Sequence, residues 1–559
     1  MTGVGETVEA DARTATAPAP CPLFSPRWLR CAAELTGPDL LDTSAALALG
    51  LCLTDAPAGT ADRILVRADL SDGHLHFTGG GWDERPTLVL TLSVADAATL
   101  LFGDGRQRVQ LFEHGGLRLE GVFLFVFFLD RMLQQDRSGV LARLRTVTEG
   151  LAPSADHGPA AAQWTSEGTD RRPSYPPEPG TGDEDPDTEA RRQAERVLPR
   201  TMSVLRDEIG RSTPGAQFAI AHHDSGTRLS VALGDCRPGV PFTRDALPIW
   251  YCCSKPVGAV AAGRLWERDL LDPMRPVAAY LPWFTGDGRE TVTLYQLLTH
   301  TSAVPMGLDP LHGTMAAPVA LRREQLRAMT VPRDVRPGTK ITYGPWWAWF
   351  LLAEVVRAVD GRAYEQFLAE EVLAPCGMRD TRVVLTPREY RRTADRLPLI
   401  HVAGGGAPIQ PTHWYATEAS CTRPIPGLNL RGPMSDLVLF FEALMNGGQG
   451  RVDRVLRPQT VMALTARHRV GLVDPFGNAD WGLGFRNESH HLGAVCTAFS
   501  RHASLRTFGH YGLWTSAAFA DPDAGLIVAL HLNGKTWQEE HQQRMIAIGD
   551  ALYEDLGLA

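Results

Sequence analysis

Residues 245–271 read DALPIWYCCSKPVGAVAAGRLWERDLL and contain the pattern that decides the fold. Lys255 follows Cys252 by three positions, and the small and apolar residues after it are typical of a buried helix. Positions i and i+3 lie on the same face of a helix, so the Cys252 sulfur and the Lys255 amine can meet. A neutral or hydrogen-bonded lysine at such a place can accept the proton of a nucleophile. The segment therefore predicts a nucleophile with its base at the start of a helix.

Four further segments follow this helix in order along the chain. They are TVTLYQLLTHTSAVPMG at 291–307, the stretch 337–382 beginning PGTKITYGPWW, LNLRGPMSDLVLFFEALMNGG at 428–448 and GHYGLWTSAAFADPD at 509–523. Together with 245–271 they resemble the serine β-lactamase and penicillin-binding-protein family, in its class C β-lactamase, esterase and acyltransferase branch. One such segment alone is a weak signal, but five in the family's order are not expected by accident. In that family a serine normally stands at the position of Cys252.

The resemblance implies a role for each matching residue. Cys252 would be the nucleophile, Lys255 its general base or proton relay, and Tyr343 a second acid and base that serves the leaving group and then the acceptor. His510 stands where the third motif of the family has its lysine, and would orient Tyr343 or the substrate. The backbone N–H groups of Cys252 and Leu513 would form the oxyanion hole. The predicted substrate-binding residues are Trp346, Tyr511 and Trp514.

Three departures from the family pattern bear on the substrate. Cys252 replaces the serine, Pro345 replaces an asparagine two residues after Tyr343, and Tyr511 replaces a small residue. In β-lactamases the missing amide contacts the acylamino group of the substrate, so the sequence argues against β-lactam recognition. A cysteine nucleophile forms a thioester, which reacts readily with amines and thiols.

The leading function expected from these residues is acyl transfer through an acyl-Cys252 thioester, as in natural-product biosynthesis. The first alternative is a hydrolase of esters, amides or thioesters in the same family. The second is a catalytically inactive protein that binds hydrophobic ligands, in which Cys252 is a buried small side chain. Three neighbouring features have plainer interpretations: Cys253 as packing, His300 as a residue that caps or bonds within its own loop, and part of the Trp346, Trp347 and Trp349 group as core.

Bulk composition limits the partners. The 559 residues carry a net charge of −9, which offers no basic face to phosphates, so nucleic acid is not expected to bind. The expected partners are a small-molecule acyl donor, free or linked to a carrier protein or coenzyme A, and an amine, hydroxyl or thiol acceptor. No apolar run has the length of a membrane span, and no secretory signal is visible, so a cytoplasmic location is expected. Nine widely spaced cysteines suggest reduced thiols, and neither a metal nor a cofactor is expected.

The chain is too long for one hydrophobic core and divides at a stretch rich in Pro, Gly, Ser and acidic residues. We expect a disordered terminus at 1–25, a first domain at 26–151, a flexible linker at 152–191 and a catalytic domain at 192–559. The first domain reads as strands at 64–70, 74–80 and 88–94, a helix at 94–103, a short strand, and a strongly apolar helix within 116–135. The phrases at 86–104 and 115–125 resemble the sterol-carrier-protein fold, which would bind lipids or acyl chains in a tunnel.

The catalytic domain reads as helices and strands at both of its ends with a helical middle. A helix is predicted at 188–212, strands at 216–224 and 227–235, a strand pair within 514–534 and a last helix at 537–556. This order predicts an antiparallel sheet built from both ends, flanked by helices, with a helical subdomain at 255–448. Both domains therefore belong to the α+β class, and the sequence leaves the oligomeric state open.

Overall fold

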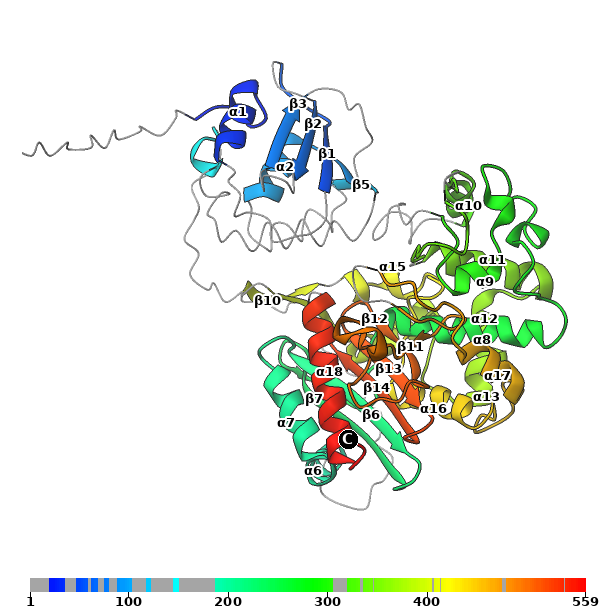
Figure 1. Cartoon of the computed structure of the whole chain (residues 1–559). Helices are drawn as coiled ribbons and strands as arrows, with labels where there is room; N and C mark the ends of the chain where they lie inside the picture. The colour runs from blue at the N-terminus through cyan, green and yellow to red at the C-terminus, as the bar shows by residue number, and fades with distance from the viewer. Residues whose placement is uncertain are drawn as a thin grey trace, which may run out of the picture. The chain divides into compact units, whose positions relative to one another are not determined.

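A computed structural model of the chain describes 15 ranges of residues (Figure 1), namely 20–35, 47–58, 62–68, 75–79, 88–102, 117–121, 144–149, 186–304, 319–331, 335–344, 346–404, 407–412, 414–474, 479–536 and 538–559. The chain divides into two compact units, Met1–Arg171 and Arg172–Ala559, and the division falls within the predicted linker. Within these described ranges, no helix has both the length and the apolar character that a bilayer crossing requires.

The first unit contains a five-stranded sheet with the strand order β3-β2-β1-β4-β5. Its elements are α1 (Pro26–Leu35), β1 (Leu47–Leu53), β2 (Arg63–Ala68), β3 (Leu75–Gly79), β4 (Leu88–Leu92), α2 (Val94–Phe102) and β5 (Leu117–Gly121). The predicted strands at β2, β3 and β4 and the predicted helix at α2 are present, whereas α1 and β1 were not predicted. β1 pairs in parallel with β4 and antiparallel with β2, so it lies in the middle of the sheet. The predicted apolar helix after residue 121 lies outside the described residues.

The second unit is built around a seven-stranded antiparallel sheet in the order β11-β12-β13-β14-β6-β7-β8. Its strands are β6 (Gly215–His222), β7 (Thr227–Arg237), β8 (Val240–Pro241), β11 (Arg486–Asn487), β12 (Phe508–Gly512), β13 (Ser516–Asp521) and β14 (Leu526–Leu532). Every residue of β6 and β14 is buried, because both faces of the sheet centre are covered. The predicted antiparallel sheet, joined from both ends of the unit, is confirmed.

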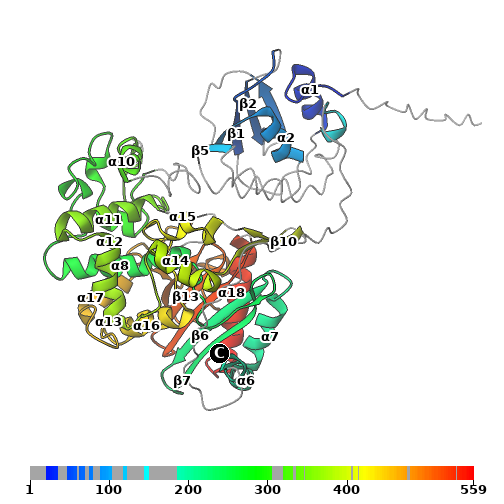
Figure 2. The same cartoon turned by 180° about the vertical axis from the view of Figure 1, so that it is seen from behind.

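Helices cover both faces of this sheet (Figure 1 and, from behind, Figure 2). On one face, α6 (Pro186–Val197), α7 (Pro199–Glu208) and α18 (Gln538–Asp555) share an apolar core with the strands. The sequence predicted one opening helix, but the structure has two, because Pro199 lacks the N–H that a continuous helix would need. α6 begins at Pro186, inside the range predicted as linker.

The other face of the sheet packs on the helical part of the unit, which holds the largest hydrophobic core among the described residues. Its helices are α8 (Lys255–Trp266), α9 (Leu294–Leu298), α10 (Val319–Arg327), α11 (Trp347–Asp360), α12 (Tyr364–Leu368), α13 (Ala374–Cys376), α14 (Pro387–Thr393), α15 (Glu418–Cys421), α16 (Met434–Met445) and α17 (Pro458–Thr465). A smaller sheet, β10-β9-β15, is formed by β9 (Ile400–Gly404), β10 (Ala407–Thr412) and β15 (Gly534–Lys535). The predicted candidate residues gather where β12 meets the start of α8.

Candidate active site

Cys252 lies in a short 3-10 turn, Tyr251–Ser254, that leads directly into α8. Tyr251 has a positive φ of 48°, an unfavourable backbone conformation for a bulky side chain that persists only where the surroundings hold it. The Cys252 side chain is 7% exposed, and the neighbouring Cys253 is buried and donates its S–H to the His510 carbonyl at 3.2 Å. Cys253 is thus a packing residue, as predicted, and Cys252 is the thiol at the turn.

Lys255 is completely buried at the first position of α8. Its Nζ donates to the Gly427 carbonyl oxygen at 3.1 Å and lies close enough to Cys252 for the two side chains to interact. Burial lowers the pKa of the Lys255 amine below its ordinary value, although the nearby Cys252 acts in the opposite direction. A lysine whose ammonium form is disfavoured in this way is suited to accept the thiol proton.

Gly427 holds the lysine and was not predicted. Its φ is +76°, and a Cβ at this position would lie 2.5 Å from Cγ of Trp349. Only glycine can combine this left-handed conformation with so close an approach to an indole ring. The Trp349 ring in turn lies 5.8 Å from the Lys255 Nζ. The amine is therefore held between a main-chain carbonyl and an aromatic wall.

Tyr343 faces the same pair of residues. Its ring centroid is 5.4 Å from the Lys255 Nζ, and the residue lies close enough to Cys252 for the two side chains to interact. Burial raises the pKa of the Tyr343 phenol well above its ordinary value, and negative charge on Cys252 raises it further. Tyr343 therefore stays a proton donor while Lys255 is the proton acceptor. Environments that separate two pKa values in this way assign the acid and the base.

His510 lies in β12 with its side chain on the site face of the sheet. Its Nδ1 donates to the Tyr511 carbonyl oxygen at 2.6 Å, which leaves Nε2 with the lone pair, and Nε2 has no hydrogen-bond partner among the described residues. Burial lowers the pKa of the imidazole well below its ordinary value, and the Lys255 charge adds to this. The structure therefore brings Cys252, Lys255, Tyr343 and a neutral His510 together.

The two predicted oxyanion donors belong to neighbouring segments, namely the hairpin after β12 and the turn that carries Cys252. Neither the Cys252 nor the Leu513 N–H donates to any acceptor in the part of the chain that the structure describes. Gly512 makes the junction possible, because a Cβ there would lie 2.2 Å from the Trp250 carbonyl oxygen. The end of β12 thus lies directly against the residue pair that precedes Cys252. Two free amides at such a place are what an oxyanion hole requires.

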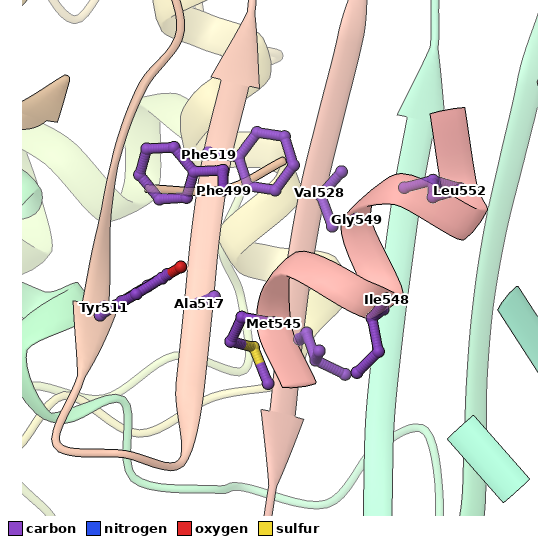
Figure 3. A pocket seen from close by; sticks show the side chains of 10 residues that line it. Phe499, Tyr511, Ala517, Phe519, Val528, Met545, Ile548, Gly549 and Leu552 are labelled. Atoms are coloured by element: carbon purple, nitrogen blue, oxygen red, sulfur yellow. The ribbon is translucent and has the colours of Figure 1, made fainter. Parts of the chain in front are cut away.

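The three predicted substrate contacts differ in where they lie. Tyr511 faces away from the site, because successive strand residues point to opposite faces and His510 occupies the site face. Its ring contacts Phe499 and His541, and it borders a small apolar cavity between the sheet and α18 (Figure 3). The structure thus does not bring the Tyr511 side chain to Cys252, which corrects the sequence-based expectation.

The two tryptophans are placed closer to the site segments. Trp346 is buried at the N-terminal end of α11 and belongs to the core of the helical part. Trp514 follows Leu513 in the hairpin after β12, with a positive φ of 60°, and the Lys535 ammonium lies 5.3 Å from its ring. A substrate contact therefore stays a prediction for both residues.

His300 is a site neighbour for which sequence reasoning predicted only a local role. Its Nδ1 accepts a hydrogen bond from the Gly344 N–H at 3.2 Å, and its carbonyl accepts one from the Thr342 N–H at 2.8 Å. Its ring centroid lies 4.2 Å from that of Tyr343. The His300 N–H also donates to the Leu297 carbonyl at 3.2 Å. The residue thus bonds within its own loop, as predicted, and also across to the two residues that flank Tyr343. Its positive φ of 56° could not be predicted from sequence.

Among the described ranges, no group of three His, Cys, Asp or Glu side chains is arranged to hold a metal ion. The side chains that the structure places together at this point are those of Cys252, Lys255, Tyr343 and His510.

An antiparallel sheet with a helical part, a thiol at the start of a buried helix, a lysine three residues on and a tyrosine opposite match the arrangement of the penicillin-recognising enzymes. The chain belongs to the Beta-lactamase family, whose model matches residues 192–553. Members of this family are hydrolases and acyltransferases, so the prediction of an enzyme is supported at that level.

Individual relatives agree with this assignment. The chain is 27% identical to Esterase EstB of Burkholderia gladioli over 372 residues, which are 61% of this chain and 90% of the esterase. It is 26% identical to Esterase/beta-lactamase LipL of Mycobacterium tuberculosis over 317 residues, covering 52% of this chain and 70% of that protein. Among solved structures, EstCE1, a hydrolase with promiscuous acyltransferase activity, matches with a TM-score of 0.53 at 21% identity over 65% of this chain and 100% of that one. A penicillin-binding-protein homologue from Caulobacter crescentus matches with a TM-score of 0.51 at 23% identity, over 64% and 97%.

Proposed function

We propose that this protein transfers acyl groups through a covalent thioester on Cys252. The observation that carries the proposal is the placement of Cys252 beside a buried lysine with a lowered pKa and a tyrosine with a raised pKa. This arrangement supplies a proton acceptor and a proton donor on the same sulfur. It is the minimum that acyl exchange at a thiol needs.

The first half of the reaction forms the thioester. The Cys252 thiol loses its proton to the neutral Nζ of Lys255, and Sγ attacks the carbonyl carbon of the donor. The carbonyl electron pair moves to the oxygen, which the amides of Cys252 and Leu513 stabilise. The C–S bond is then complete, and the bond to the leaving group breaks as the electron pair returns. The leaving group takes a proton from Tyr343, which recovers one from Lys255.

The second half releases the acyl group. An amine, hydroxyl or thiol acceptor attacks the thioester carbonyl and gives up its proton to the Tyr343–Lys255 pair. The C–S bond breaks, and Sγ regains a proton, so the enzyme returns to its starting state. Because thioesters react faster with amines and thiols than oxygen esters do, the cysteine favours transfer over hydrolysis. The promiscuous acyltransferase activity of the similar EstCE1 structure is compatible with this chemistry.

A hydrolase is the second candidate, and the esterase relatives favour it. It uses the same acyl-Cys252 intermediate with water as the acceptor. Formation of product from added amine, compared with release of free acid, separates the two functions. A role in natural-product biosynthesis belongs to the transfer proposal, since cysteine-dependent acyl exchange suits the assembly of amides and esters.

We assign the first unit an acyl- or lipid-binding role. We also place the two domains at residues 26–151 and 192–559. The support is the order of its described elements, in which four strands are followed by α2 and then by β5. Leu90, Leu92 and Leu100 are buried on one side of this sheet and helix, so apolar side chains line the unit's interior. An acyl donor with a long chain would match such an interior.

Intact-mass spectrometry tests the proposal directly. The protein is incubated with a short acyl thioester, such as an acyl N-acetylcysteamine, and then with a primary amine. We expect an added acyl mass that maps to Cys252 and disappears on addition of amine, with formation of the amide. The variant Cys252→Ala is the control and must not be acylated. Absence of any adduct on the native protein would contradict both the transferase and the hydrolase.

A further inference from the structure

The hairpin that carries the Leu513 amide has an unfavourable backbone. Leu513 and Trp514 have φ values of +21° and +60°, in the left-handed region that bulky residues rarely adopt. Each such residue persists only where the surrounding structure determines it. The Thr515 N–H donates to the Gly512 carbonyl at 2.8 Å and closes the turn, but this bond leaves the orientation of the turn relative to Cys252 unrestrained.

Arg544, on α18, binds this turn from behind the sheet. Its Nη2 donates to the Trp514 carbonyl oxygen at 2.6 Å and to the Gly534 carbonyl oxygen at 2.8 Å. The same guanidinium group therefore ties the hairpin to the start of β15. Gly534 is tightly confined as well, because a Cβ on it would lie 1.9 Å from the Ser212 carbonyl oxygen. Arg544 thus connects the turn to a part of the fold that cannot move.

The remaining guanidinium nitrogens are also held. Nη1 donates to Ser212 Oγ at 3.1 Å, and Nε donates to Nδ1 of His541 at 3.3 Å. The Ser212 hydroxyl in turn donates to the Glu208 carboxylate. No carboxylate lies within ion-pair distance of Arg544 among the residues that the structure describes. Its side chain is 3% exposed, so this buried cation is satisfied almost entirely by neutral acceptors.

A buried cation without a carboxylate partner lowers the stability of the fold, so a role beyond stability is expected for it. Burial lowers the pKa of Arg544 to about 9, which measures how poorly the site solvates a charge. A neutral side chain that fills the same space would avoid that cost. The guanidinium offers what a neutral side chain lacks, namely a planar fork of donors that fixes two carbonyl groups at once.

We propose that Arg544 is the positioning residue of the oxyanion hole, and that it sets the direction of the Leu513 N–H by holding the Trp514 carbonyl. This inference rests on the proposed function, because it requires an oxyanion to form at Cys252. Leu513 itself packs on Ile249 and Tyr251 from the other side. Apolar contacts therefore hold the turn on one side, and the Arg544 guanidinium holds it on the other.

Two thiol-directed probes distinguish the loss of oxyanion-hole positioning from general damage to the site. An alkyl trifluoromethyl ketone adds reversibly to the Cys252 sulfur and places an alkoxide in the hole. Iodoacetamide forms a C–S bond with the same sulfur by displacing iodide, with no oxyanion. In Arg544→Met, we expect the affinity for the ketone to fall by roughly 10- to 100-fold, since loss of an aligned hole donor has effects of this order. The iodoacetamide rate at Cys252, followed by peptide mass mapping, is expected to stay within about twofold, as no hole donor takes part.

Arg289→Met is the matched control. Arg289 is also buried and donates to main-chain carbonyls, those of Thr285 and Met329, but it lies in the helical part. We expect both probes to react with this variant as with the native protein. Arg544→Lys keeps one charged donor and is expected to recover part of the ketone affinity.

The outcomes are distinguishable. Loss of ketone affinity together with an equal loss of alkylation, or no loss of either, would overturn the positioning role. If Arg544→Met does not fold, Arg544→Lys decides by the same comparison, and an unchanged ketone affinity in that variant also overturns it. Failure of both probes to label Cys252 in the native protein would instead refute the proposed function.

Discussion

Replacing Gly512 by alanine should separate the two halves of the oxyanion hole. The new Cβ would lie 2.2 Å from the Trp250 carbonyl oxygen, whereas Cβ contacts shorter than 3.0 Å are essentially never seen. Relief requires a shift of roughly 1 Å between β12 and the nucleophile turn, and a displacement of that size at a reacting centre costs about 10²-fold in rate. Overpacking of this kind also lowers the free energy of unfolding by about 1–3 kcal/mol.

The assay is the rate of acylation by a chromogenic ester under single-turnover conditions, combined with a thermal melt. Gly226→Ala is the control, because Gly226 has a φ of +64° and a Cβ there meets nothing within 4 Å. That variant should lose about 1 kcal/mol of stability from backbone strain and acylate at the native rate. If Gly512→Ala acylates within about twofold of the native rate, the contact between β12 and Trp250 does not define the hole.

Five other outcomes are expected. Cys252→Ala should abolish turnover with the fold intact by circular dichroism, and retention of more than a few per cent of the activity would remove the nucleophile assignment. Lys255→Met and Tyr343→Phe should each slow acylation by about 10²–10⁴-fold. In the native protein kcat/KM should rise with pH as Lys255 loses its proton. The rise should level off below the ordinary lysine pKa of 10.5, because burial lowers the pKa of Lys255. A plateau reached only above pH 10.5 would contradict this. Chromogenic cephalosporins should be poor substrates because Pro345 supplies no side-chain amide, and efficient hydrolysis would argue against that reasoning. Limited proteolysis near Gly180 should release two folded pieces, of which the C-terminal one still acylates; unfolding of that piece on separation would show one cooperative unit.

The main features of the catalytic unit follow from local sequence patterns. Alternating apolar residues predicted β6, β7, β13 and β14, and the spacing of Cys252 and Lys255 predicted their contact. The orientation of Tyr511 could also have been predicted from the sequence, because adjacent residues of a strand face opposite ways and His510 was already assigned to the site. The single long opening helix was wrong for a reason visible in the sequence, namely Pro199.

Other parts depend on contacts between distant segments and leave no local pattern. Gly427 is one of many glycines until its carbonyl is seen to accept from Lys255. His300 and Arg544 act on residues of other segments through main-chain groups, for which no side-chain motif exists. β1 is mostly leucine and alanine, which does not separate a central strand from a helix.

The closure of the sheet also sets when the site around Cys252 can assemble during synthesis. Thr213, just before β6, donates to Asn533, just after β14, across 320 positions of sequence, and β14 pairs directly with β6. A ribosome needs roughly 15–60 s to make that stretch at about 5–20 residues per second. Cys252 is made early in this interval, whereas β12 and the Leu513 amide that follows it are made only near its end. The nascent chain therefore carries Cys252 before the proposed oxyanion hole exists, and the proposed site can assemble only when translation of the sheet is complete.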